Sequence, residues 1–303
     1  MENLELPRSV EIIEVGPRDG LQNESNFVPT KVKAAFIEAL WQAGFKEMEI
    51  TSFVSPKWVP QMGDAAEVIR LSGNHPGTIV LTPNKRGIDT ALASGARAVA
   101  VFIGVSSSFN QKNINKTTDE ALNGLIPHIR ELKNKGVFVR ACISTAFHCP
   151  YEGEIAPADT IALCKVLADA GVNELSVADT IGKATPQESF SLFSLLKREL
   201  PGVLIAAHFH DTRKMALANI YASLQAGVTR FDSSAGGLGG CPFAPGASGN
   251  AATEDVVYML HRMGIETGVD LNLLNHAISV VEPHLSRELT SWYYQSYKKE
   301  QHS

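Results

Sequence analysis

Two histidines stand two residues apart at the end of an apolar segment, in the run Ala206-Ala207-His208-Phe209-His210-Asp211-Thr212. Side chains at this spacing project from one face of a β-strand, so the two imidazoles would lie close enough to bind one metal ion. A second apolar segment ends beside the neighbouring residues Arg18 and Asp19. A lone histidine is more often structural, but this pair together with Asp19 favours a divalent-metal site.

The ligand types available are oxygen and imidazole. An octahedral ion would need Asp19, His208, His210 and one further oxygen, such as the amide of Asn250, with open positions for substrate or water. No additional cluster of histidine or cysteine completes a closed tetrahedral site. A structural zinc site is therefore not expected.

The segment Gly237–Asn250, GLGGCPFAPGASGN, contains five glycines and two prolines, which exclude regular helix or strand. It contains one thiol, Cys241, and precedes an amphipathic segment that Asn250 is expected to cap. The lysine of a phosphate-binding P-loop is absent. We interpret the segment as a loop that closes over a reaction, although a surface turn with an incidental cysteine is the alternative.

Further polar residues interrupt other apolar segments. Glu47 and Glu49 share one face of a predicted strand, and at least one of them should meet polar partners. Asp179 and Thr180 end another predicted strand, where they could orient Arg18 or a metal ligand.

The 303 residues are 44% hydrophobic and 19% charged, with a net charge of −5, as expected for a globular protein with a sizeable core. The acidic balance argues against nucleic acid and membranes as partners, so an anionic ligand would need a local basic pocket. Ser106–Lys116, basic at Lys112, is either such a contact or only a flexible loop. Four cysteines without a CxxC pair, and a start without a signal-peptide pattern, predict a cytoplasmic protein.

Short apolar segments alternate eight times with segments of helical periodicity, which predicts an α/β fold, a (β/α)8 TIM barrel, over about residues 10–265. The rest, about 266–303, is predicted to form additional C-terminal helices in the same domain, covering part of the barrel or a subunit contact. The predicted strands are Val10–Val15, Glu47–Thr51, Thr78–Leu81, Ala98–Gly104, Val137–Thr145, Glu174–Asp179, Leu204–His210 and Arg230–Ser234. The predicted helices are Lys31–Ala43, Asp64–Leu71, Arg86–Ser94, Asp119–Lys135, Pro157–Ala170, Pro186–Leu200, Arg213–Ala226 and Thr253–Met263. Catalytic residues of such barrels lie at the carboxyl ends of the strands, where these polar residues occur.

Four motifs resemble the 3-hydroxy-3-methylglutaryl-CoA (HMG-CoA) lyase family: RDGLQNE at Arg18–Glu24, ADTIG at Ala178–Gly182, HFHDT at His208–Thr212, and the cysteine loop with its following helix at Gly237–Leu260. The resemblance covers nearly the whole chain, and the cysteine loop is its most specific part. More distantly, the chain is similar to metal-dependent barrels such as isopropylmalate synthases, homocitrate synthases and pyruvate-type aldolases. Arg213 and Lys214 depart from the family, which often has an aromatic residue and a glycine there. They lie either on a surface helix, which we favour, or where they alter contacts near the mouth of the barrel.

The resemblance implies cleavage of HMG-CoA, an acyl-CoA, to acetoacetate and acetyl-CoA with the help of Mg²⁺ or Mn²⁺, in leucine and ketone-body catabolism. It implies Asp19, His208, His210 and Asn250 as metal ligands. The implied catalytic residues are Arg18 at the thioester carbonyl, Glu49 in support, Asp19 or His208 as the base, and the thiol of Cys241. The substrate contacts expected beside Arg18 are Gln22, Lys112, Asn113, Asp179 and Thr180.

Three alternatives stay open. The first is a lyase for a longer 3-hydroxy-3-alkylglutaryl-CoA, such as the isohexenyl analogue. The second is a condensing synthase, which is disfavoured because those chains usually add a further domain. The third is a non-catalytic metal-binding barrel used for binding or assembly. Barrels of this family are commonly dimers, so a homodimer is expected.

Overall fold

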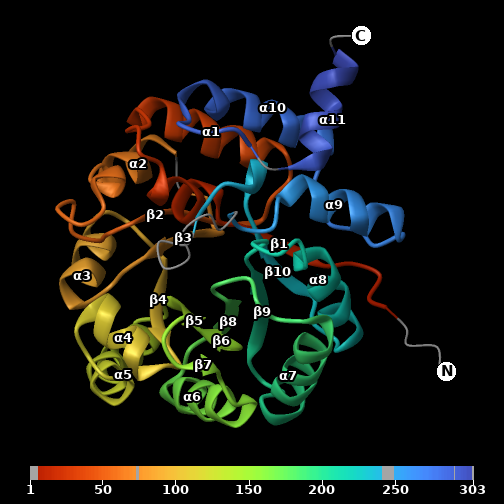
Figure 1. Ribbon diagram of the computed structural model, residues 1–303. Helices are drawn as coiled ribbons and strands as arrows, with labels where there is room; N and C mark the ends of the chain where they lie inside the picture. Colours follow the sequence, from red (N-terminus) through yellow and green to blue (C-terminus); the bar gives the residue numbers. More distant parts are fainter. Residues whose placement is uncertain (1–5, 73–74, 241–248, 290, 302–303) are drawn as a thin grey trace.

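The computed structural model describes residues 6–72, 75–240, 249–289 and 291–301. Eight parallel strands close into a barrel in the order β1-β10-β9-β8-β5-β4-β3-β2, with helices around them (Figure 1). The barrel strands are β1 (Glu11–Glu14), β2 (Glu47–Ser52), β3 (Thr78–Leu81), β4 (Ala98–Gly104), β5 (Phe138–Ser144), β8 (Glu174–Asp179), β9 (Leu204–Phe209) and β10 (Arg230–Ser233). The predicted barrel is therefore confirmed, with every strand within one residue of its predicted bounds.

The helices that follow the strands form the outer layer because their apolar faces pack on the barrel. They are α1 (Thr30–Gln42), α2 (Ala65–Leu71), α3 (Lys85–Ala93), α5 (Thr118–Asn134), α6 (Pro157–Ala170), α7 (Pro186–Glu199), α8 (Ala216–Gln225) and α9 (Thr253–Arg262). A short hairpin, β6 (His148–Cys149) with β7 (Gly153–Glu154), precedes α6. The predicted C-terminal helices are also present as α10 (Leu271–Val281) and α11 (Trp292–Gln301). Figure 1 shows α10 beside α1, and α11 projecting from the barrel.

The segment Ser106–Lys116 is a helix, α4 (Ser107–Ile114), so the flexible-loop interpretation was wrong. The Ser106 hydroxyl caps it by accepting a hydrogen bond from the amide of Phe109. Asn110 is buried and exchanges two 2.8 Å hydrogen bonds with the backbone of Gly104, at the end of β4. These contacts fix a polar sequence whose composition alone suggested a loop.

The amino-terminal half of the barrel interior contains charged side chains. Glu47, Glu174 and Arg230 begin their strands and form one layer, in which the Arg230 guanidinium contacts both carboxylates. Glu49 and Asp232 lie two residues further along β2 and β10, and the guanidinium of Arg140, from β5, lies between their carboxylates. The barrel interior is thus filled by a column of ion pairs that leads towards the carboxyl ends of the strands.

The glycines after α1 and α3 allow a stability prediction. Gly44 has φ +103°, and a Cβ there would lie 2.2 Å from the carbonyl oxygen of Gly268. Gly95 has φ +93° with no heavy atom within 4 Å of the same position. Gly95→Ala should therefore cost only the backbone strain, about 1 kcal/mol of unfolding free energy, and Gly44→Ala about 2 to 4 kcal/mol. Urea denaturation of both variants measures the difference, and equal losses would contradict the steric argument.

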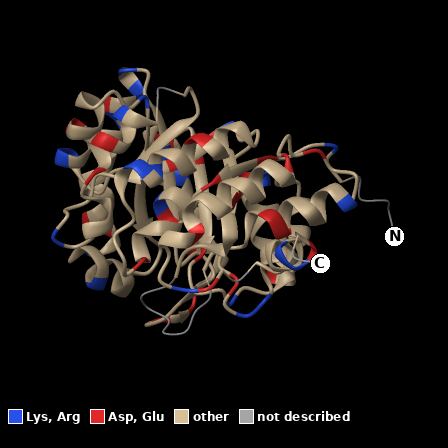
Figure 2. Ribbon diagram, turned by 90° about the horizontal axis from the view of Figure 1, so that it is seen from above, with Lys and Arg blue, Asp and Glu red and all other residues tan. Residues whose placement is uncertain are grey.

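Basic and acidic residues are interspersed over the helices in the view of Figure 2. This mixture agrees with the modest net charge of −5. Among the described residues, no helix is long and apolar enough to cross a membrane.

Candidate active site

Asp19, His208 and His210 meet at the carboxyl end of the barrel. Asp19 lies in the turn η1 (Gly16–Gly20) after β1, and the histidines lie on and just after β9. All three are buried, and one potential ligand atom of each lies within 4.8 Å of the other two. Phe209 points the opposite way, towards Phe147 and Phe193, as the strand alternation predicted. Proximity of the pair to Asp19 was likewise expected.

Asn250 joins this cluster through an isolated β-bridge with His210. Its Nδ2 donates to Asp19 Oδ2 at 2.8 Å and to the carbonyl of Leu238 at 3.1 Å. It does not cap a helix, contrary to our prediction: α9 has Ala252 at its N-cap position and no side-chain cap, because Asn250 turns into the barrel. Asn250 therefore belongs to the site rather than to the helix.

The cluster fits a hard divalent cation. Its donor atoms are carboxylate and amide oxygens and imidazole nitrogens, which is a set that Mg²⁺ or Mn²⁺ accepts. Asn250 Oδ1 and His210 Nδ1 are buried and have no hydrogen-bond partner among the described residues. Buried polar atoms are normally paired, so these two atoms are available as ligands of a bound cation.

Arg18 binds the carboxylates on either side of it. Its Nη1 donates to Asp19 Oδ1 at 2.6 Å and its Nε to Glu49 Oε2 at 2.7 Å. Burial would lower the pKa of Arg18, but the charges of Glu49 and Asp19 outweigh it and raise that pKa above its ordinary value. Glu49 supports Arg18 as expected, and Glu47 also has a polar partner, Arg230.

The charges of the cluster favour cation binding. Burial opposes ionisation of Asp19, but Arg18 and the two histidines outweigh it and lower the pKa of Asp19 to about 2. Burial, followed by the charge of His208, lowers the pKa of His210 to about 4. Burial lowers the pKa of His208 as well, but the hydrogen bond to Asp232 outweighs it and raises that pKa. At neutral pH the cluster therefore offers an ionised carboxylate and a neutral His210.

Two charged residues behind the cluster were missed by the sequence reasoning. The carboxylate of Asp232 lies 3.0 Å from His208 Nδ1, and its other oxygen accepts a hydrogen bond from the guanidinium of Arg140. Both residues stand inside predicted strands, on the same face as their inward-pointing neighbours. That inward-facing position in a predicted strand was the available signal.

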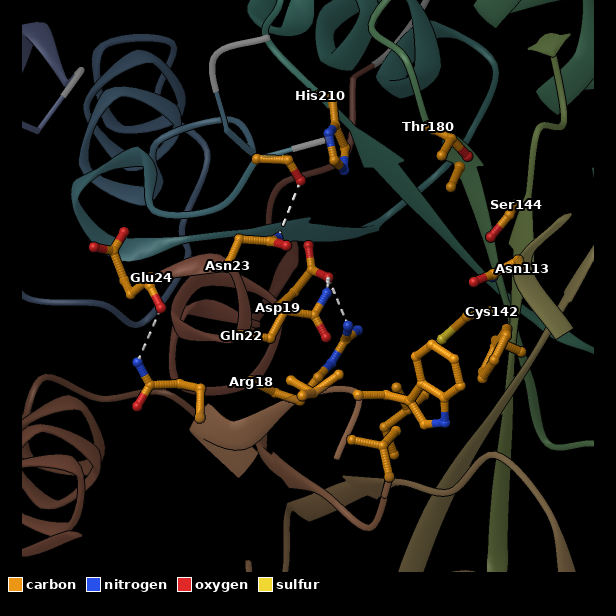
Figure 3. Close-up of a pocket in the computed structure, with 18 of the residues that line it drawn as sticks. Arg18, Asp19, Gln22, Asn23, Glu24, Asn113, Cys142, Ser144, Thr180 and His210 are labelled. Atoms are coloured by element: carbon orange, nitrogen blue, oxygen red, sulfur yellow. Dashed lines mark hydrogen bonds and ion pairs between the residues drawn. The ribbon is translucent and has the colours of Figure 1, made fainter. Parts of the chain in front are cut away.

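A cavity of about 570 Å³ opens over the cluster (Figure 3). Its polar lining consists of Arg18, Asp19, Gln22, Asn113, Thr180, His208 and His210, among other residues. Its apolar lining includes Leu81, Phe102 and Cys142 at the ends of β3, β4 and β5, and Val54 and Trp58 after β2. The volume is typical of a site for a small organic ligand. One wall thus presents the charged cluster, and another offers apolar contact.

Asp179 does not reach this cavity. Its carboxylate accepts hydrogen bonds from the backbone amides of Lys183 at 3.0 Å and Ala184 at 2.9 Å. It therefore fixes the turn between β8 and α7, and the expectation that it orients Arg18 or a metal ligand was wrong. Thr180 does line the cavity, and its hydroxyl accepts from the amide of Thr145 at 2.7 Å.

Three other expected features lie outside the cavity or outside the described residues. Lys112 places its ammonium 4.7 Å from the ring centre of Tyr151 and is not among the residues that line the cavity. Arg213 and Lys214 precede α8 rather than lying on it, which corrects our expectation of a surface helix. Arg213 donates to the carbonyls of Ile181 and Gly182 at 3.0 Å and so holds the turn after β8. Cys241 lies outside the described residues.

The side chain of Glu14, at the end of β1, links segments that surround the site. One oxygen of its fully buried carboxyl group accepts from the amides of Gly16 and Ala235 at 2.7 and 2.9 Å, and the other lies 2.7 Å from the hydroxyl oxygen of Thr253. Burial raises the pKa of Glu14 to about 8, against the lowering effect of these hydrogen bonds. This shift favours the protonated carboxyl group in the folded protein at pH 7.

This shift predicts a pH-dependent stability. A raised folded-state pKa stabilises fully below the unfolded value of 4.5, and this contribution is lost as the pH rises towards about 8. Glu14→Gln keeps the shape and removes the titration. Between pH 5 and 8 the wild-type protein should lose on the order of 3 kcal/mol of unfolding free energy relative to Glu14→Gln. Urea denaturation across this range measures the difference, and parallel stability profiles would refute the assignment.

A family profile and several known proteins match most of this chain. The family profile described as HMGL-like matches residues 9–281. The mitochondrial hydroxymethylglutaryl-CoA lyase of Bos taurus is 48% identical over 94% of this chain and 88% of its own length. The lyase YngG of Bacillus subtilis is 45% identical over 96% of this chain and 98% of its own.

Solved structures agree with these relatives. The hydroxymethylglutaryl-CoA lyase of Pseudomonas aeruginosa superposes with a TM-score of 0.94 at 41% identity, covering 97% of this chain and 99% of that one. An HMG-CoA lyase of Acinetobacter baumannii in complex with coenzyme A and 3-methylmalate gives a TM-score of 0.90 at 33% identity, with 95% of both chains covered. The carboxyl transferase domain of Rhizobium etli pyruvate carboxylase, 17% identical with a TM-score of 0.70, shares the fold.

Proposed function

Because the chain belongs to the HMGL-like family, we propose that the cavity binds HMG-CoA and that the enzyme cleaves it to acetoacetate and acetyl-CoA. The observation that carries this proposal is the cluster of Asp19, His208 and His210 beside Arg18, in a chain so similar to HMG-CoA lyases over nearly its full length. In the reaction the C3 hydroxyl loses its proton, the C2–C3 bond breaks, and C3 becomes the ketone of acetoacetate. The electron pair passes to C2 as the thioester enolate, which is then protonated to acetyl-CoA.

Asp19, His208, His210 and Asn250 are the residues that would hold the divalent cation. Bound there, Mg²⁺ or Mn²⁺ would lower the pKa of the C3 hydroxyl and orient the substrate. Their burial removes competing water, which strengthens the interaction of the carboxylate with a cation. The unpaired Asn250 Oδ1 supports this assignment.

The remaining steps involve the other catalytic residues that we propose. Arg18 presents a permanent cation to the developing enolate oxygen, and its two carboxylate partners hold the guanidinium in place. Asp19 or His208 accepts the hydroxyl proton. The thiol of Cys241 protonates the enolate carbon. Gln22, which donates to Asp19 Oδ1 at 2.9 Å, together with Asn113 and Thr180, contacts the substrate.

The test is an assay of metal-stripped protein with HMG-CoA, before and after addition of Mg²⁺ or Mn²⁺. Metal-dependent formation of acetoacetate and acetyl-CoA in equal amounts is the expected result. Absence of both products with every divalent ion would reject the lyase function and leave the non-catalytic barrel. Because the cavity has an apolar wall at Leu81, Phe102 and Cys142, cleavage of a substrate with a longer 3-alkyl substituent is the second candidate function. The same assay with the isohexenyl thioester distinguishes the two by their kcat/KM values.

The setting of this activity is also a proposal. The proposed products, acetoacetate and acetyl-CoA, support a role in leucine and ketone-body catabolism. The described cysteines Cys142, Cys149 and Cys164 are free thiols, in agreement with a reducing cytoplasm. A homodimer is supported by exposed aromatic side chains on the C-terminal helical side, Tyr258 at 47% and Trp292 at 73% exposure. Sedimentation velocity of the wild type and of Trp292→Glu tests the dimer.

A further inference from the structure

The two histidines of the cluster differ in what holds them from behind. His208 Nδ1 lies 3.0 Å from Asp232 Oδ2, an oxygen that also accepts from the Ser176 hydroxyl at 2.7 Å. His210 Nδ1 has no hydrogen-bond partner among the described residues. Only one of the two imidazoles in this cluster is thus oriented by a carboxylate.

The carboxylate of Asp232 is itself fixed. Its Oδ1 accepts from Nη2 of Arg140, a side chain with no exposed surface. The same guanidinium lies 3.5 Å from Glu49 Oε1 and 3.2 Å from Glu174 Oε1. Glu49 in turn binds Arg18. The buried guanidinium of Arg140 therefore contacts both the carboxylate that holds His208 and the carboxylate that holds Arg18.

We propose that Asp232, anchored by Arg140, is a positioning residue that fixes the tautomer of His208. An ionised carboxylate can only accept hydrogen bonds, so a neutral His208 must carry its proton on Nδ1. Nε2 is then left with its lone pair as the atom that binds a cation, so Asp19 and not His208 would be the base while the cation is bound. His210 has no such constraint. This inference rests on the metal site of the proposed function.

The variant that tests the tautomer is Asp232→Asn, which keeps the size of the side chain. The Arg140 guanidinium can only donate, so it should hold the amide oxygen and turn the amide NH₂ towards His208. His208 must then accept at Nδ1 and carry its proton on Nε2, the ligand atom. We expect the dissociation constant of Mn²⁺, measured by calorimetry without substrate, to rise about 10- to 100-fold.

Glu174→Gln is the matched control. It makes the same carboxylate-to-amide change in another fully buried partner of Arg140, at the first residue of β8 and without contact to His208. Because it also removes one buried negative charge, we expect its Mn²⁺ dissociation constant to rise, but by no more than about threefold. Equal losses in both variants would indicate a structural role only. Unchanged affinity in Asp232→Asn would exclude the positioning role, and either result overturns the proposal.

A measurement on the wild type covers the case in which Asp232→Asn does not fold. Histidine ¹⁵N spectra of the metal-free protein, at an alkaline pH where the imidazoles are neutral, should show His208 protonated at Nδ1. Protonation at Nε2 would overturn the proposal. These readouts do not depend on turnover, so a wild type that shows the tautomer but cleaves no HMG-CoA would fail the proposed function and not this inference.

Discussion

Arg18→Met is expected to lower kcat for HMG-CoA by about 10²- to 10³-fold, which is the usual cost of removing a group that stabilises a developing oxyanion. Arg18 is 7% exposed, and its guanidinium is held by Asp19 and Glu49 at the cavity wall. Methionine keeps part of the volume and removes the charge at the enolate oxygen. Steady-state kinetics at saturating Mg²⁺ and substrate measure the change.

Arg70→Met is a matched control for this substitution. Arg70 also pairs with a carboxylate, Glu67, but it lies exposed on α2. Its kcat should equal that of the wild type. Circular dichroism establishes that both variants fold, and a folded Arg18→Met protein with near-normal kcat would remove Arg18 from the mechanism.

Asp19→Ala is expected to lower both Mn²⁺ affinity and kcat, each by at least about 100-fold. The substitution removes an ionised ligand and leaves Arg18, Gln22 and Asn250 without a shared partner. The low pKa of Asp19, about 2, means that the lost group is ionised throughout the physiological range. Calorimetric titration with Mn²⁺ gives the affinity, and the thioester assay gives kcat.

An aspartate outside the cavity serves as the control. Asp89 lies exposed on α3 and pairs with Lys85. Asp89→Ala should leave both quantities unchanged, so it separates loss of a ligand from loss of a surface charge. Wild-type Mn²⁺ affinity in Asp19→Ala would contradict the ligand assignment.

Most of the fold could be predicted because each element carried its own local signal. The barrel strands are short apolar segments, and glycines such as Gly44 and Gly171, which adopt positive φ, follow the helices. Helix α4 could not be predicted in this way. Its sequence is polar, and its stability depends on the buried amide of Asn110 binding the strand β4, which is a tertiary contact.

The cluster could be predicted where the alternation of a strand fixed the direction of a side chain. His208 and His210 follow this rule. Asp179 does not. A polar residue at a strand end can bind either a ligand or the backbone of the following turn, and Asp179 accepts hydrogen bonds from backbone amides of that turn. Arg140 and Asp232 are 92 residues apart in sequence, so their pairing depends on closure of the barrel.

The column of ion pairs inside the barrel is not electrically neutral. Counted up to the cavity, three guanidiniums (Arg18, Arg140 and Arg230) face five carboxylates (Asp19, Glu47, Glu49, Glu174 and Asp232), which leaves two negative charges in excess. A dication in the cluster would offset this excess in a region where water screens little. Removal of the divalent ion by a chelator should therefore lower the melting temperature of the protein as well as its activity. An ion that binds only the folded state stabilises that state.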